Sequence, residues 1–483
     1  MSKETDQSHS KVEDNFSSTA ELAKNTGFQS TLSIASKDVE EQKKPYNPFE
    51  NRNLEHPNST LGSIVHLLKA CLGSGILAMP AAFKNSGLLG GSIGTLIAGV
   101  VCTHAMKLLV DTSQKVCVDA EKPFLGYADT CGATFKYGPK GLRKYANVFK
   151  TLVDFSMAAT YIGVMCVYIV FIGSSFKEVL DPYTVGNQLS IQMYCALTLV
   201  PLVLISQIRN LKYLVPFSLL ANALITVVFA ITMYYMFSDL PSITDNDRVK
   251  VASPMQWPLF FSTVIFAMEG VGVVMPVENE MKHPQRFLGC PGVLNVSMVI
   301  VISLYGIFGF FGYLKYGDAV KGSITLNLPQ DAWLAQAAQL LMALVIFFSY
   351  ALQFYVPMEM INRMLANRKT RDHENVIQIT IRTVLVAVSV GIAAAFPNLE
   401  LVISLVGAIF LSTLGILIPA IIDTVYRWER GLGPCNYVLY KNIVLGFISV
   451  FALFSGSYTS ISAMLAGEGH DVIEEIASNA TLF

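Results

Sequence analysis

Charged residues are scarce in this sequence. Of its 483 residues, 14% are Asp, Glu, Lys or Arg, whereas a soluble domain has about a quarter. The 34 basic and 35 acidic residues nearly cancel, so no charge excess points to nucleic acid as a partner. Apolar runs of about 20 residues recur after residue 60, each long enough to span roughly 30 Å of hydrocarbon. The sequence therefore predicts an all-α, multi-pass membrane protein in a lipid bilayer.

Catalytic and metal-binding motifs are also missing. The eight cysteines show no Cys-x-x-Cys spacing and no Cys/His cluster, which argues against a metal site. Cys117 and Cys131 share a loop that we expect in the cytosol, where thiols stay reduced, so free thiols are expected throughout. No nucleophile–base pair or phosphate-binding loop stands out. We therefore expect neither an enzyme nor a bound cofactor.

The first 60 residues lack the apolar core of a cleavable signal peptide. They are polar and rich in Ser, Lys, Asp and Glu, which is typical of a disordered segment. We expect residues 1–60 to form a disordered cytosolic tail, residues 61–465 the membrane domain, and residues 466–483 a short non-cytosolic tail.

Eleven membrane spans are predicted. They run approximately over 61–83, 87–111, 147–176, 189–207, 213–237, 257–277, 290–314, 333–362, 376–396, 399–422 and 436–464. Loops rich in Lys and Arg alternate with loops that are poor in them, and the rich set is expected in the cytosol. The rich loops include Lys115, Arg209, Lys282, Arg368, Arg427 and Arg430. This places the N-terminus in the cytosol and the C-terminus, with the sequon at Asn479, on the other side; whether Asn479 is glycosylated stays open.

Two of the spans are interrupted. Gly73 and Gly75 lie at the middle of 61–83, and Gly270 lies within 257–277. Non-helical backbone at membrane depth is tolerated where it is buried in protein or lines a cavity. The two spans are first and sixth, as in a five-plus-five inverted repeat with discontinuous helices 1 and 6 and one extra helix. The pattern favours a transporter with a midplane binding site over a continuous ion pore.

The first break predicts a site for a carboxylate. Gly73 and Gly75 flank Ser74, so the backbone can leave helical geometry at low steric cost. The following half-helix begins near Ile76, and its free N–H groups and dipole favour an anion, with the Ser74 hydroxyl as a further donor. The alternative is a face of small residues packed against a neighbouring helix.

The second break predicts contacts to an ammonium group. Unwinding at Gly270 would free carbonyls near Ala267, and Phe266 could wall a side-chain pocket. Glu269 is a carboxylate near mid-membrane, which is costly if it is charged and alone. Substrate-amine contact, proton transfer and a structural hydrogen bond all remain open for it. Glu278, just past the break, is expected in a solvated turn, with a part in an inner gate as the alternative.

Two histidines and a lysine are further candidates for proton coupling. His66 and Lys69 lie three residues apart on one helix face, and histidine titrates near neutral pH. A buried neutral histidine and a lysine that reaches the membrane surface are the alternatives. His104 in the second span is a weaker candidate, because it lies near the inner end beside Lys107, where structural packing is expected.

Four stretches resemble proton-assisted amino acid transporters of the amino acid/auxin permease superfamily. They are HLLKACLGSGILAMP at 66–80, FAMEGVGVVMPVEN at 266–279, and the runs at 322–329 and 350–357. The resemblance covers about residues 50–465. It implies a LeuT-like fold and symport of protons with small neutral amino acids into the cytosol. A plasma-membrane, lysosomal or late endosomal location is also implied, as is proton coupling at His66, with a second family histidine at His104.

The external loops depart from that family. Mammalian members resemble one another in a disulfide between the loop after the third span and the segment before the eighth. Here residues 181–189 and 330–333 contain no cysteine, so the bridge is expected to be absent. Properties that depend on the external loops, including substrate range and affinity, are therefore not carried over from the family.

A second functional hypothesis is an amino-acid sensor, or transceptor. Such a protein would bind amino acids in the same pocket and signal through partners of the N-terminal tail, with little transport.

Overall fold

The computed structural model describes residues 46–52, 54, 57–184, 189–209, 211–243, 248–268, 270–365 and 374–480. The chain divides into residues 1–47 and 48–483, and the second unit holds all the helices discussed here. Within the described residues, nine helices are long and apolar enough to cross a membrane, and a bent pair makes a tenth. The apolar segment Ile191–Ser206 is shorter, so eleven crossings and the inverted repeat stay predictions.

The first predicted span consists of two helices. α3 (Thr60–Cys71) and α4 (Ser74–Lys84) meet at an angle of 52°, with Leu72 and Gly73 between them. The Ser59 side chain caps α3 by accepting a hydrogen bond from the Gly62 N–H. The predicted interruption at the glycine pair is present.

The second interrupted span is α11 (Trp257–Ala267) followed by α12 (Val271–Asn279). α11 ends where the Met268 N–H still bonds back to the Val264 carbonyl at 2.9 Å. Gly270 precedes α12 with φ −140° and ψ −7°, outside helical geometry. Glu269 lies outside the described residues.

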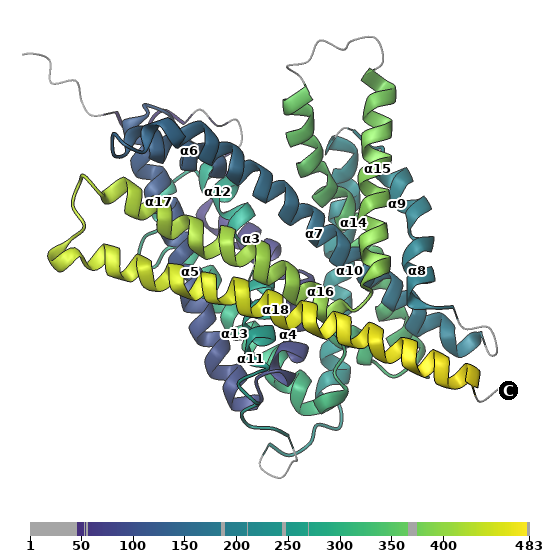
Figure 1. Cartoon of the computed structure of the whole chain (residues 1–483). Coiled ribbons are helices and arrows are strands. Elements are labelled where there is room, and N and C mark those ends of the chain that lie inside the picture. Colours follow the sequence, from purple (N-terminus) through teal and green to yellow (C-terminus); the bar gives the residue numbers. More distant parts are fainter. Residues whose placement is uncertain are drawn as a thin grey trace, which may run out of the picture. The chain divides into compact units, whose positions relative to one another are not determined.

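The remaining helices surround these two pairs (Figure 1). They are α5 (Leu88–Asp119), α6 (Tyr127–Tyr137), α7 (Ala146–Leu180), α8 (Ile191–Leu197), α9 (Leu199–Ser206), α10 (Leu211–Phe237), α13 (Val293–Tyr316), α14 (Trp333–Leu365), α15 (Glu374–Ala395), α16 (Leu399–Val406), α17 (Ile418–Arg427) and α18 (Tyr437–Ala480). Two π-helical turns, Gly407–Leu411 and Thr413–Leu417, connect α16 to α17.

The core lies around α4 and α11. Nine of the eleven residues of α4 are buried, and α13 packs against α3, α4 and α5. α18 runs as one long helix alongside α16 and α17 (Figure 1). Its outer face exposes Phe447, Phe451 and Phe454, as expected for side chains that meet lipid.

Some boundaries differ from the sequence prediction. α5 continues to Asp119 rather than ending near 111, because Val116 and Cys117 bury themselves against Leu125 and Tyr426. α6 forms within a region predicted as loop. It buries Cys131, and this burial raises the pKa of the Cys131 thiol well above its usual range. Helix α18 also extends to Ala480, past the predicted end of the last span at residue 464.

All eight cysteines lie in the described part of the chain, and none of them forms a disulfide there. Six of them are buried, whereas Cys290 and Cys435 are exposed.

Candidate functional site

The two helix interruptions touch each other. A methyl group added at Gly75 would lie 2.7 Å from the Ala267 Cα, closer than real contacts allow, so the first break fits the second only with glycine there. The hydroxyl of Tyr305, on α13, lies within hydrogen-bond distance of two acceptors that share its one proton, the Ala267 carbonyl at 2.8 Å and the Cys71 carbonyl. Tyr305 is fully buried, so it joins the ends of α3 and α11 inside the protein.

A cavity of about 90 Å³ lies where the breaks meet. Both interrupted spans contribute to its wall, and α7 and α14 close its sides. The lining residues are Ala70, Cys71, Gly73, Ser74, Gly75, Tyr161, Val164, Tyr168, Phe266, Ala267, Gly270, Gly272, Val273 and Gln353. We refer to it as the central cavity.

The backbone gives the central cavity two chemically different sides. The first N–H groups of α4 and α12 have no partner within their helices, and no side chain caps either terminus. Cys71 and Ala267, which end α3 and α11, line the same cavity and carry the last carbonyls of those helices. Free N–H groups with the positive end of a helix dipole suit a carboxylate, and carbonyls suit an ammonium. The arrangement can therefore hold a zwitterion.

Six of the eight residues predicted to bind substrate line this cavity: Gly73, Ser74, Gly75, Phe266, Ala267 and Gly270. Ile76 is buried in the core and does not line it, because the half-helix α4 turns its side chain into the packing. Glu269 lies outside the described residues.

A second cavity of about 530 Å³ lies beside the first. His66 and Lys69 of α3 both line it, which places the two proton-coupling candidates on one face as predicted. Both side chains are exposed, and neither makes a hydrogen bond or ion pair with a described residue. The two cavities share Ala70, Gly73, Tyr168 and Gln353. We refer to the second as the lateral cavity.

The lateral cavity is also lined by polar side chains of α10 and α14, of which the sequence alone draws attention to Ser349, as a small polar group within an apolar run. Ser218, Asn222 and Thr226 follow one another at four-residue spacing on α10, and Ser349 and Gln353 do so on α14. This spacing puts each set on one helix face. A polar stripe inside an apolar span was the signal that would have found them.

His104 lines neither cavity. It is half-buried on α5, and its Nε2 has no hydrogen-bond partner among the described residues. Lys441 and Asp423 lie within electrostatic reach of it. The structure therefore separates His104 from His66 and Lys69.

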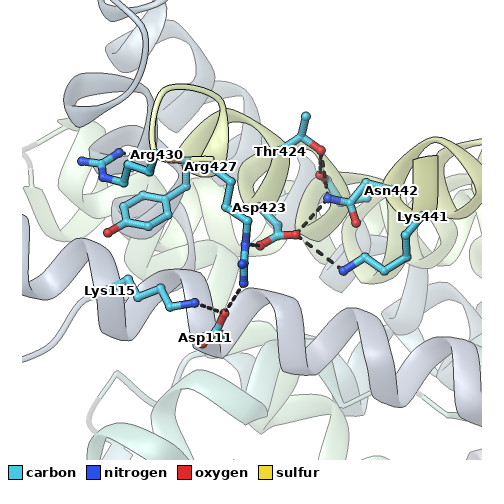
Figure 2. Close-up of polar contacts among 10 residues, drawn as sticks. Asp111, Lys115, Asp423, Thr424, Arg427, Arg430, Lys441 and Asn442 are labelled. Carbon is cyan, nitrogen blue, oxygen red and sulfur yellow. Dashed lines mark hydrogen bonds and ion pairs between the residues drawn. The ribbon is translucent and has the colours of Figure 1, made fainter. Parts of the chain in front are cut away.

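A charge network near His104 ties three helices together (Figure 2). The buried Asp423 of α17 accepts hydrogen bonds from Arg427 at 2.7 Å and from Asn442 of α18 at 2.9 Å. Arg427 also reaches Asp111 of α5 at 3.0 Å. The carboxylate of Asp423 is thus neutralised where it is buried, and the network fixes α18 to the bundle. We call this end of the bundle, which carries Lys115, Arg427 and Arg430, the basic end.

A second buried ion pair lies at the basic end. The Nη2 atom of Arg52 lies 3.1 and 3.2 Å from the two carboxylate oxygens of Glu278, and both side chains are at most 3% exposed. Gln114 donates to the same carboxylate at 2.8 Å. Glu278 is therefore not in a solvated turn as predicted, because a cation from the N-terminal segment covers it. Removing one partner of such a pair typically costs about 3–5 kcal/mol.

Comparisons with known proteins agree with this geometry. A family model described as "Transmembrane amino acid transporter protein" matches residues 56–462. The Proton-coupled amino acid transporter-like protein pathetic of Drosophila melanogaster is 39% identical over 416 residues, which are 86% of this chain and 87% of that protein. Vacuolar amino acid transporter 3 of Saccharomyces cerevisiae is 28% identical over 306 residues, which are 62% of this chain and 41% of that protein.

Among solved structures, the inward-facing conformation of Mhp1 is similar in fold. Its TM-score is 0.53 and its identity 12%, over 87% of this chain and 92% of that one. The predicted family is confirmed by the sequence matches, and the relatives named are transporters rather than enzymes. This chain belongs to the transmembrane amino acid transporter family.

Proposed function

We propose that the protein is a symporter that carries small neutral amino acids together with protons into the cytosol. The observation that supports this most directly is the central cavity, which is built from both interrupted spans and presents N–H groups on one side and carbonyls on the other. The substrate carboxylate binds at the N-terminus of α4, from Gly73 to Ile76. Its ammonium meets the carbonyls near Ala267, with Glu269 and Gly270 at the same break.

The size and lining of the central cavity support a small, uncharged side chain. About 90 Å³ leaves little room beyond the zwitterion, and Tyr161, Tyr168 and Phe266 wall it. No charged side chain lines it among the described residues. A substrate side chain with a charge would lose its water there without a partner.

The lateral cavity supports a place for the proton. His66 and Lys69 are exposed to it, and Gln353 and Tyr168 separate it from the central cavity. His66 takes up the proton from the non-cytosolic side and releases it to the cytosol, while Lys69 supplies a fixed cation. The name of the Drosophila relative points to the same coupling ion.

The proposed setting is a plasma, lysosomal or late endosomal membrane with the N-terminus in the cytosol. The basic end then faces the cytosol, in keeping with the positive-inside rule. The vacuolar relative from yeast favours an intracellular membrane.

The test is uptake of a panel of radiolabelled amino acids into vesicles reconstituted with the purified protein. An inward proton gradient without sodium should drive uptake of alanine, glycine and similar substrates, and His66→Ala should abolish the stimulation. Uptake that required sodium and ignored pH would refute the proton assignment. Uptake of charged amino acids alone would refute the substrate assignment.

A further inference from the structure

We propose that Arg52 is a positioning residue for transport, which holds α3 to α12 at the basic end. Its bonds to Glu278 and Pro123, which we call the latch, must break before the central cavity opens at that end. This inference rests on the proposed function for its meaning. The contacts of Arg52, however, are observed in the structure, and the experiment that tests their role does not require transport.

The movable partner in this latch is α3. Only Ser63, Leu67 and Cys71 of its twelve residues are buried, whereas α4 is buried at nine of eleven positions. The two are joined by the non-helical Leu72 and Gly73, and nothing lies within 4 Å of the point where a Gly73 side chain would be. A loosely packed half-helix with an open hinge can swing while α4 stays fixed.

The N-terminal segment ties the outer end of α3 to the turn after α12. Asn58 lies two residues before α3, and its N–H donates to the Glu280 carbonyl at 2.8 Å. The Lys282 N–H in turn donates to the Asn58 carbonyl at 2.9 Å, forming a parallel bridge. A swing of α3 away from α12 must break this bridge.

Arg52 fastens the same segment more strongly. Besides its bonds to the Glu278 carboxylate, its Nη1 donates to the Glu278 carbonyl at 3.0 Å and its Nε to the Pro123 carbonyl at 2.9 Å. One guanidinium thus joins the N-terminal segment, the end of α12 and the loop after α5. Burial from water strengthens these bonds, so they hold the segment in place more firmly than a surface ion pair would.

The Glu278 site is also suited to release. Gln114 bonds to the Glu278 carboxylate at 2.8 Å independently of Arg52. When Arg52 leaves, the carboxylate keeps this partner and gains water from the opened side. The released state therefore does not contain a bare buried charge, and the latch can open and close reversibly.

The experiment measures access to Cys71, which lines the central cavity and is 3% exposed. Cys290 and Cys435, the exposed thiols, are first replaced by serine. Vesicles that present the basic end outward are then treated with a small methanethiosulfonate reagent, and Cys71→Ser identifies its share of the reaction. Arg52→Ala and Glu278→Gln should each raise the rate of Cys71 modification at least fivefold.

Glu280→Gln is the matched control, since Glu280 lies in the same turn but is exposed, and glutamine keeps an acceptor for the Asn58 side-chain amide, which donates to the Glu280 carboxylate at 3.2 Å. It should leave the Cys71 rate as in the unsubstituted protein. The double variant Arg52→Ala/Glu278→Gln should match Arg52→Ala alone, because the Glu278 carboxylate has already lost Arg52 in that variant. If Arg52→Ala does not fold, Arg52→Lys is used instead. Lysine keeps the charge but cannot make all the bonds of the guanidinium group, so this variant should raise the rate of Cys71 modification by a smaller factor.

An unchanged Cys71 rate in folded Arg52→Ala or Arg52→Lys protein would overturn the proposal, as would an equal rise in Glu280→Gln. The two proposals fail separately. Faster Cys71 modification in a protein that transports no amino acid would keep the latch and reject the proposed function. Amino acid uptake with an unchanged Cys71 modification rate in these variants would keep the proposed function and reject the latch.

Discussion

The hydroxyl of Tyr305 lies 2.8 Å from the carbonyl oxygen of Ala267, at the point where α11 stops being a helix. The same hydroxyl contacts the Cys71 carbonyl at the end of α3. Tyr305 comes from α13, outside both interrupted spans. A freed carbonyl in a buried place is costly without a donor, so this residue helps to hold both breaks open; the Cys71 carbonyl also accepts from the Gly73 N–H at 2.8 Å.

Tyr305→Phe should therefore loosen both breaks at once. The substitution removes the hydroxyl, which takes this donor from the Ala267 carbonyl and leaves the Cys71 carbonyl with the Gly73 N–H alone, at a cost of about 1–3 kcal/mol. We expect a lower melting temperature in detergent and a roughly tenfold loss of amino acid uptake, since each 1.4 kcal/mol corresponds to a factor of about ten. Unchanged uptake would mean that the breaks hold without this bond.

The close contact between the breaks predicts different effects for two neighbouring glycines. Gly75→Ala forces a methyl group against the Ala267 backbone, and overpacking of this kind costs about 1–3 kcal/mol. Gly73→Ala meets nothing within 4 Å. We expect Gly75→Ala to lower both thermal stability and uptake, and Gly73→Ala to fold with a melting temperature near that of the unsubstituted protein. Equal stability of the two variants would contradict the direct contact between the breaks.

The two candidate histidines should differ in their effect on pH dependence. His66 faces the lateral cavity, which adjoins the central one, whereas His104 lines neither. Acidifying the non-cytosolic side should raise uptake by the unsubstituted protein, because more protein then carries the coupling proton. His66→Ala should flatten this pH profile, and His104→Ala should keep its slope. A flat profile in His104→Ala alone would move proton coupling to the second histidine.

The sensor hypothesis is tested by shortening the N-terminus at the right place. Removing residues 1–55 would also remove Arg52 and leave Glu278 short of its cation, so a transport defect would follow from the latch alone. Removing residues 1–45 keeps Arg52. In a transporter this shorter deletion should leave uptake unchanged. Loss of growth signalling with intact uptake would show a signalling role for the tail.

The interrupted spans could be predicted from the sequence because their cause is local. Gly73, Gly75 and Gly270 disfavour a continuous helix, and the standard length of a membrane span places these glycines in the interior of their spans. The charged residues that α5 contributes to the basic end could also be found in the sequence, but their ion-pair partners could not. Sequence alone does not show which acid meets which base across helices.

The side walls of the central cavity could not be predicted in this way. Tyr161, Tyr168 and Gln353 lie in spans that are apolar all round, so periodicity does not show which face turns inward. Arg52 looked like one basic residue in a polar tail, and only its burial against Glu278 separates it from its neighbours. α6 was missed because its surroundings read as a charged loop.

A density map of the protein bound to a small neutral amino acid such as alanine would show most directly whether the substrate binds in the central cavity. We expect density for the ligand between the two breaks, with its carboxylate against the N–H groups from Ser74 to Ile76 and its ammonium beside the carbonyls near Ala267. Ligand density elsewhere, or α3 and α4 joined as one straight helix through Gly73, would contradict this expectation.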